Sequence, residues 1–185
     1  MLDQHPHLAH IIAGRHYLIA TDGASKGNPG PGGWGLVKQL KDGDRLLKQL
    51  ADAGHSIAAL DELITTNNRM ELMAALMAVE GVKEKETPAI IMTDSKYVLG
   101  GMTEWLPKWI AKGWKGSEGA VKNQDLWQRL DAARAGKTIH WVKVKGHSGH
   151  SLNEMADTLA DSAARGRYPK GRQSVQAVHP DWFKG

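Results

Sequence analysis

Four acidic residues, Asp22, Glu71, Asp94 and Asp157, stand in contexts that suit metal chemistry. Asp22 and Asp94 follow apolar runs of strand type, and ligands of α/β sheets gather at the carboxyl ends of strands. Glu71 and Asp157 lie in segments of helical pattern that must pack against such a sheet. Acids that converge in one cleft repel one another and resist ionisation, and a divalent cation removes that conflict. Oxygen ligands without cysteine predict Mg²⁺ or Mn²⁺ rather than zinc.

Each acid taken alone also has an ordinary structural explanation. Asp22 could start a turn, and Asp94 could cap the helix that follows it. Glu71 could be the first-turn glutamate of a capping box, and Asp157 could lie on a solvated helix face. The sequence alone leaves these alternatives open for each residue, and it is the combination of four that favours a metal site.

Two histidines offer a weaker metal site. His147 and His150 have a spacing that zinc sites use, but they stand in a glycine-rich stretch without further ligands. We therefore do not expect a zinc site there.

The stretch "TDGASKGNPGPGGWG", residues 21–35, holds six glycines and two prolines. It could cradle a phosphate, form a plain turn, or let the backbone approach a ligand closely. The pattern G-x-x-x-x-G-K-[ST] is absent, and the stretch joins two expected strands rather than a strand and a helix. The phosphate cradle is thus disfavoured, and the other two explanations remain.

Hydrophobic patterning predicts the elements that must position the acids. Residues 1–15 are expected to be a loose extension, and residues 44–63 are ambiguous between a strand, a helix and an inserted loop. The helix from residue 67 is expected to begin with an asparagine cap and a capping box. Strand hairpins followed by alternating helices and strands indicate a mixed sheet with helices on its faces. The expected strands are 16–22, 33–40, 88–94 and 138–146, and the expected helices are 67–82, 95–106, 122–136 and 151–166.

Composition limits the class of protein. The 185 residues suit one domain, the formal net charge is +4 and the isoelectric point is about 9.3, which favours a polyanionic partner without proving one. The chain has no cysteine, no signal-peptide pattern and no apolar run near the roughly 20 residues of a membrane span. We expect a soluble, cytoplasmic protein without a membrane partner.

Five segments resemble bacterial type I ribonucleases H: "TDGASKGNPGPGGWG", "TTNNRMELMAAL", "TDSKYV", "VKNQDLWQRL" and "WVKVKGHSGHSLNEMADTLA". The resemblance runs from about residue 17 to 164, which leaves an N-terminal extension at 1–16 and a basic tail at 165–185. It implies a ribonuclease H-like α/β fold, with a mixed five-stranded sheet flanked by helices. It also implies a monomeric endonuclease that hydrolyses the RNA of RNA–DNA hybrids to 5′-phosphate and 3′-hydroxyl ends, as in removal of RNA primers and R-loops.

The resemblance assigns roles to the acids. Asp22 would bridge two Mg²⁺ ions, Glu71 and Asp94 would complete the leaving-group site, and Asp157 would help hold the ion that carries the nucleophilic water. His147 resembles the mobile histidine of the family, which is proposed to move protons or assist product release. The glycine-rich stretch would lie close to the RNA strand, with Asn28 in contact.

Further residues are expected to contact the hybrid substrate. "WLPKWIAKGWKG" resembles the basic protrusion that grips the DNA strand, although its tryptophans could equally pack in the core. Position 64, often arginine in relatives, is isoleucine here, and residues 38–63 are longer than in close relatives. The expected contacts are Thr66 and Asn123 to a DNA phosphate, Asn67 and Asn68 near the RNA strand, Lys96, and on the protrusion Trp105, Lys108, Trp109, Lys112, Trp114 and Lys115.

Two other functions share this fold. A non-catalytic module that binds hybrids or double-stranded RNA could have lost one of the acids, and all four are present. A related DNA nuclease or recombinase is disfavoured by the motifs "TTNNRMEL" and "GHSGH".

Overall fold

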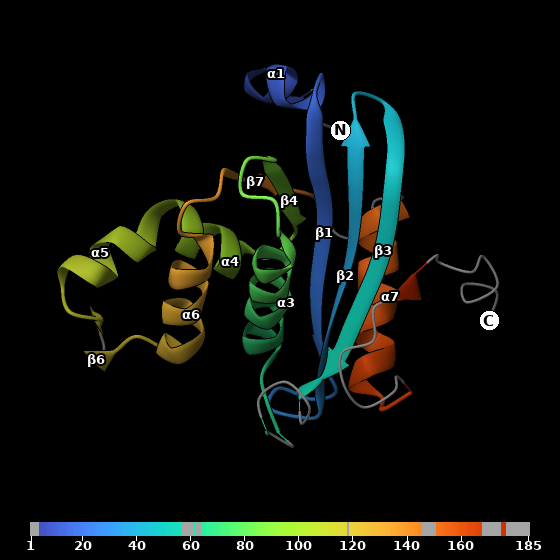
Figure 1. The fold of residues 1–185 in the computed structure, drawn as a ribbon. Helices are drawn as coiled ribbons and strands as arrows, with labels where there is room; N and C mark the ends of the chain where they lie inside the picture. The colour runs from blue at the N-terminus through green and yellow to red at the C-terminus, as the bar shows by residue number, and fades with distance from the viewer. Residues whose placement is uncertain are drawn as a thin grey trace.

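The computed structural model describes residues 4–56, 61, 64–117, 119–145, 151–167 and 175–176. Its centre is a mixed sheet in which β1, β2 and β3 form an antiparallel meander and β4 and β7 extend the sheet in parallel beside β1 (Figure 1). The predicted five-stranded mixed sheet is confirmed, and a short strand, β8, adds to the outer edge of β3. The strands are β1 (Arg15–Ser25), β2 (Gly32–Asp42), β3 (Arg45–His55), β4 (Ala89–Thr93), β7 (Ile139–Lys143) and β8 (Val175–Gln176).

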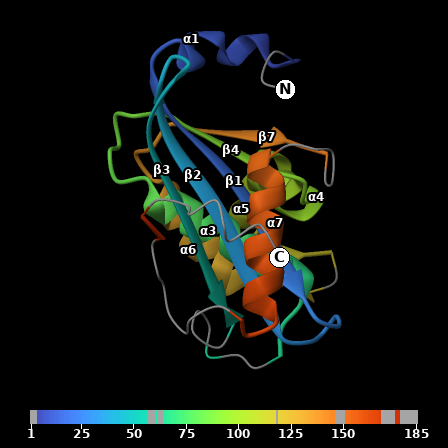
Figure 2. The same cartoon turned by 90° about the vertical axis from the view of Figure 1, so that its right-hand side faces the viewer.

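Helices cover both faces of this sheet (Figure 2). One face packs against α3, which in turn packs against α6, and the other face packs against α7. Two short strands, β5 (Lys115–Gly116) and β6 (Gly119–Ala120), form a separate hairpin after α5. The helical segments are η2 (Pro6–Leu8), α1 (Ala9–Ile12), α3 (Asn67–Gly81), α4 (Lys96–Gly100), the π-turn η3 (Gly101–Trp105), α5 (Leu106–Ala111), α6 (Gln124–Arg134) and α7 (Ser151–Ala164).

Alternation along β1 divides the buried side chains into two cores. Tyr17 and Ile19 belong to the core under α3, while Leu18 and Ala20 belong to the core under α7. This is the period of two that a strand imposes when both of its faces are covered. Because the two cores share β1, the helices on opposite faces are held in a fixed relation to the same strand.

Within the ambiguous region 44–63, residues 45–55 form the strand β3, which pairs with β2 apart from one irregularity at Leu40 and Lys41, and residues 57–60 and 62–63 lie outside the described residues. The expectation of a loose N-terminal extension is wrong for part of it. Leu8 is fully buried and Ile11 nearly so, and both belong to the core under α7. These apolar side chains stabilise the packed conformation of residues 8–11.

Small residues bring α7 unusually close to the sheet. A Cβ atom added to Gly33 of β2 would lie 2.6 Å from the Cβ of Ala163, and one added to Gly35 would lie 2.5 Å from the carbonyl oxygen of Ala156. Glycine is therefore required where β2 passes under this helix. The close contact places Asp157, the neighbour of Ala156, beside the central strands.

Candidate active site

All four predicted carboxylates line one open cleft of about 680 Å³. Asp22 comes from β1, Glu71 from α3, Asp94 from the link between β4 and α4, and Asp157 from α7. Residues that are far apart in the chain are thus brought to one place by the sheet and its two covering helices.

Strand pairing and a glycine contact explain how three of the acids meet. The parallel register pairs Ala20 of β1 with Met92 of β4, so that Asp22 and Asp94, each two residues further, lie at the same level of the sheet. A Cβ atom on Gly23 would lie 2.6 Å from the Cα of Glu71 and nearer still to its backbone nitrogen. The backbone beside Asp22 therefore touches α3 at Glu71 itself.

The ordinary structural explanations fail for Asp22 and Asp94. Asp22 does not start a turn, because β1 continues to Ser25 and Asp22 is paired with Gly35 of β2. Asp94 does not cap α4, because the cap is Ser95, whose hydroxyl accepts a hydrogen bond of 3.2 Å from the backbone N–H of Val98.

The capping box expected at Glu71 is also wrong. The N-cap of α3 is Thr66 rather than an asparagine, and its hydroxyl accepts from the backbone N–H of Arg69. Glu71 lies in the second turn, where its carboxylate accepts hydrogen bonds from the Nδ2 of Asn67, at 2.9 Å, and from the hydroxyl of Ser95. These contacts orient Glu71 toward the cleft instead of toward the helix end.

Burial and neighbouring acids change the ionisation of Asp22 and Glu71. Burial, together with the charges of Asp94, Asp157 and Glu71, raises the pKa of Asp22 to about 8, against the opposing hydrogen bond from the N–H of Gly23. Burial also raises the pKa of Glu71, an effect that the hydrogen bond from Ser95 opposes. No lysine or arginine is among the causes that act on Asp22 or Glu71.

The donor set fits a hard divalent cation. Carboxylate oxygens are the ligands that Mg²⁺ and Mn²⁺ prefer, and a cation would relieve the repulsion that raises the pKa of Asp22. In the described ranges no three His, Asp or Glu side chains are placed so that they could hold a metal ion together. The cleft thus supplies the charge and the chemistry for a cation, and binding would have to draw the carboxylates together.

Without metal, we expect the free energy of unfolding to fall as pH rises from about 4 to about 8. Folded Asp22 titrates near pH 8 and an unfolded aspartate near 3.9. Between these values the folded state binds more protons than the unfolded state, so a rise in pH lowers the free energy of unfolding. Each unit of difference is worth about 1.4 kcal/mol, shared among the interacting acids. Urea unfolding in EDTA at pH 5, 6.5 and 8 measures this fall, which should be much smaller in Asp22→Asn. Equal falls in the two proteins would contradict the shifted pKa.

Three of the predicted substrate contacts lie at the cleft, and a fourth is bonded to one of them. Asn67, Asn68 and Lys96 line it together with the carboxylates. Asn28 of the glycine-rich loop accepts a hydrogen bond of 3.1 Å from the backbone N–H of Asn67. This bond fixes the loop against the start of α3, and a close approach of the loop backbone to a ligand stays a prediction.

The two predicted phosphate contacts are connected through Arg69, which the sequence analysis missed. Arg69 follows the cap residue Thr66 by three positions, and its guanidinium donates to the side chains of Asn123, at 3.4 Å, and Asp125, at 2.9 Å. Position 64, where relatives often carry arginine, is an isoleucine that is 53% exposed. Arg69 thus links the start of α3 to Asn123, the residue that precedes α6.

On the protrusion, tryptophans and lysines behave differently. The ring of Trp109 lies 5.7 Å from that of Trp105 and 5.4 Å from that of Trp127 on α6, and Trp114 is also packed against the core. The three lysines predicted beside these tryptophans, at positions 108, 112 and 115, are exposed. The aromatic rings thus form part of the packing, and contact of these side chains with DNA stays a prediction.

Two of the histidines lie in a part of the chain that the structure does not describe, and some residues of the cleft carry little sequence signal. His147 and His150 lie outside the described residues, so the role expected for His147 stays a prediction. The cleft is also lined by Lys26, Ser95 and Asp161, none of which the sequence analysis selected. Only Ser95 carried a sequence signal, because it directly follows Asp94.

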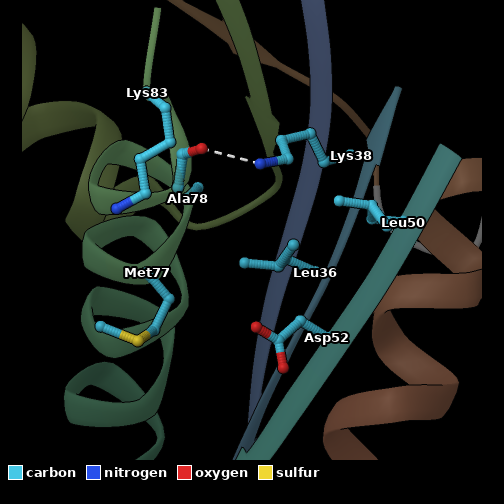
Figure 3. Close-up of a pocket in the computed structure, with 8 residues that line it drawn as sticks. Leu36, Lys38, Leu50, Asp52, Met77, Ala78 and Lys83 are labelled. Carbon is cyan, nitrogen blue, oxygen red and sulfur yellow. Dashed lines mark hydrogen bonds between the residues drawn. The ribbon is translucent and has the colours of Figure 1, made fainter. Parts of the chain in front are cut away.

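A second hollow, of about 310 Å³, lies between α3 and the strands β2 and β3, away from the cleft that holds the four predicted acids (Figure 3). Leu36, Leu50 and Met77 form its apolar walls. The ammonium of Lys38 donates a hydrogen bond of 2.7 Å to the carbonyl of Gly81 and so gives a backbone carbonyl at the end of α3 a hydrogen-bond partner. The four carboxylates have no part in this hollow.

The chain matches the family model described as RNase H over residues 14–165. It is 50% identical over 141 residues to Ribonuclease H of Paracoccus denitrificans, covering 76% of this chain and 86% of that protein. It is 49% identical over 153 residues to Ribonuclease HI of Caulobacter vibrioides, covering 82% and 95%.

Solved structures agree with the sequence relatives. LC9-RNase H1, described as a type 1 RNase H with the type 2 active-site motif, is 31% identical with a TM-score of 0.76, and the match covers 91% of this chain and 81% of that one. The foamy viral protease-reverse transcriptase in complex with RNA/DNA hybrid shares the fold at 22% identity, with a TM-score of 0.66 and coverage of 83% and 20%. No helix among the described residues is long and apolar enough to cross a membrane.

Proposed function

Because the chain belongs to the ribonuclease H family, we infer that it is a divalent-metal-dependent endonuclease that hydrolyses the RNA strand of RNA–DNA hybrids. The observation that carries this function is the meeting of Asp22, Glu71, Asp94 and Asp157 in one cleft. Burial raises the pKa of Asp22, and so do the charges of Asp94, Asp157 and Glu71, which a metal cofactor would neutralise.

The proposed cofactor is a pair of Mg²⁺ ions, with Mn²⁺ as a substitute. When bound between these acids and a phosphodiester, such ions activate a water and stabilise the leaving oxygen. By resemblance to the family, Asp22 would hold both ions, and it is the acid whose pKa the other three acids raise. Glu71 and Asp94 would hold the ion on the leaving-group side, and Asp157 would hold the other.

The chain's own residues prepare this site. Asn67 and Ser95 hold the carboxylate of Glu71 from two directions, and Ser95 is itself fixed as the cap of α4. Such outer hydrogen bonds keep a ligand in its productive orientation before the cation arrives.

Substrate recognition would be divided between the strands. Asn28, Asn67 and Asn68 carry the polar groups suited to read the RNA strand, which differs from DNA by its 2′-hydroxyl. Thr66 and Asn123, with Arg69 bonded to Asn123, would bind a DNA phosphate. The exposed lysines of the protrusion would contact the DNA backbone by charge.

The test is cleavage of labelled RNA–DNA hybrid, double-stranded RNA and double-stranded DNA, in Mg²⁺ and in excess EDTA. We expect cleavage of the hybrid's RNA strand alone, and only with the divalent cation. Undiminished cleavage in EDTA would contradict the metal site. Tight binding of the hybrid without cleavage in Mg²⁺ or Mn²⁺ would instead indicate a binding module.

Two further expectations are that the protein is a monomer and that it is cytoplasmic. Size-exclusion chromatography tests the first and cell fractionation tests the second.

A further inference from the structure

One carboxylate at the wall of the cleft is surrounded by three cations. Asp161 of α7 accepts from the ammonium of Lys26 through Oδ1 and from the Nε of Arg165, at 2.7 Å, through Oδ2. The guanidinium of Arg167 lies 3.8 Å from the same Oδ2. Lys26 comes from the glycine-rich loop, so the cluster joins that loop to the end of α7.

This cluster has more positive charge than its one acid can neutralise. Hydrogen bonds from Arg165 and Lys26 hold the pKa of Asp161 below its usual range, so the carboxylate remains charged. The side chains of Arg165 and Arg167 are 50% and 65% exposed, and exposed ion pairs stabilise a fold only weakly. Three cations around one carboxylate leave a surplus of two positive charges at the surface.

The cluster adjoins the four acids. Asp161 stands one helical turn after Asp157, Lys26 stands four residues after Asp22, and both line the same cleft as the acids. A nucleic-acid strand that lays one phosphate on the acids must pass along this wall with its next phosphates. Guanidinium groups suit those phosphates because they donate two parallel hydrogen bonds.

We propose that Lys26, Arg165 and Arg167 form a phosphate-binding subsite for the RNA strand, beside the four acids. The proposal rests on the function inferred above and adds a contact to it. Asp161 positions the three cations while the cleft is empty and competes with the phosphate for them when substrate arrives. The strand bound is the RNA strand, because the strand that reaches the acids is the one that is cut.

Two kinds of substitution should have opposite effects on hybrid affinity. Lys26→Ala and Arg165→Ala should each weaken binding severalfold and lower the slope of log affinity against log salt by about 0.9 for each phosphate that is no longer bound, the value for duplex DNA. Asp161→Asn should tighten binding severalfold, because it removes the competing charge. Binding is measured in Ca²⁺ in place of Mg²⁺, over a range of salt. Arg165→Lys, which keeps the charge, should retain most of the salt slope.

Arg15→Ala is the matched control. Arg15 is an exposed, ion-paired arginine, bonded to Glu84, and it begins the strand β1 whose far end precedes Lys26. Its removal should leave hybrid affinity and salt slope unchanged. Thermal unfolding of every variant shows whether each remains folded.

Several outcomes would overturn the subsite. If Asp161→Asn weakens binding as Arg165→Ala does, the cluster is only a structural tether between the loop and α7. If the cation variants keep the wild-type salt slope, no phosphate binds there.

A single neutral methylphosphonate linkage, placed in turn at each position of either strand, tests which strand the subsite binds. In the RNA strand it should weaken hybrid binding by the wild type at one position and have no further effect on binding by Lys26→Ala. An effect confined to linkages of the DNA strand would contradict the assignment. Hybrid cleavage by the wild type is measured separately, so the subsite can fail while the inferred activity stands.

Discussion

Replacement of Asp94 by asparagine is expected to lower the rate of hybrid cleavage by roughly 10²–10⁴-fold. A metal ion stabilises the transition state by several kcal/mol, and each ~1.4 kcal/mol of lost stabilisation lowers the rate tenfold. Asparagine keeps the size of the side chain and one oxygen but loses the charge that attracts the cation. The fold should persist, because Asp94 caps no helix and the cap of α4 is Ser95. Removal of one acid from the cluster also relieves repulsion on Asp22. Single-turnover cleavage in Mg²⁺ and thermal unfolding in EDTA measure the two effects.

Ser95→Ala supplies the comparison for stability. Loss of this cap should cost about 1 kcal/mol of folding stability, whereas Asp94→Asn should cost none. Hybrid affinity in Ca²⁺ should largely survive in Asp94→Asn, because the asparagines, the protrusion and the glycine-rich loop remain. Near-normal cleavage by a stable Asp94→Asn protein would show that Asp94 is not a required metal ligand.

The substitution Gly23→Ala should be among the glycine-to-alanine changes that lower the folding stability of this chain most. The new Cβ would overlap the backbone of α3 at Met70 and Glu71, and backbone atoms cannot move aside as a flexible side chain can. Overpacking typically costs about 1–3 kcal/mol and occasionally more, and we expect about 3 kcal/mol or more here because the overlap is with main chain. Since Gly23 adjoins Asp22, the displacement should also separate Asp22 from Glu71 and reduce cleavage. Urea unfolding and hybrid cleavage are the measurements.

Gly14→Ala is the control for an added methyl group. A Cβ at Gly14 would meet nothing nearer than the carbonyl oxygen of Ile11, at 4.0 Å, and its backbone has no positive φ. We expect a change within about 0.5 kcal/mol for this variant. If Gly23→Ala is equally mild, α3 does not pack against β1 as closely as the structure shows.

Much of the fold was predictable because its elements carry clear local patterns. The strand AIIMT and the helix from residue 67 are apolar over lengths that suit buried elements. Gly136 was expected to end a helix, and in the structure it follows the end of α6 with a φ of 70°. The acids could be selected because two of them follow strand-like runs. β3 stayed ambiguous because its sequence, RLLKQLADAGH, does not alternate cleanly, and its pairing with β2 decides its conformation.

Contacts between distant residues could not be predicted. The choice of Thr66 over an asparagine as a cap, and of Ser95 over Asp94, depends on backbone angles that several neighbouring polar residues could satisfy. Lys26 and Asp161 are separated by 135 positions, and neither has a local pattern that marks it. The tryptophans of the protrusion could pack or bind, and only the position of Trp127 on α6 shows that Trp109 packs.

The close contact between α7 and β2 implies that the two faces of the sheet differ in how much sequence change they can absorb during evolution. Under α3 the contacts are made by long, adaptable side chains such as Met70, Met73 and Met77, and exchanges of similar volume there usually cost less than about 1.5 kcal/mol. Under α7 the spacing at Gly33 and Gly35 is set by main chain and alanine, so even one added methyl group has no room. Lineages of this protein should therefore change more in the core beneath α3, outside the contact of Gly23 with that helix, and remain fixed along the line of contact that carries Asp157.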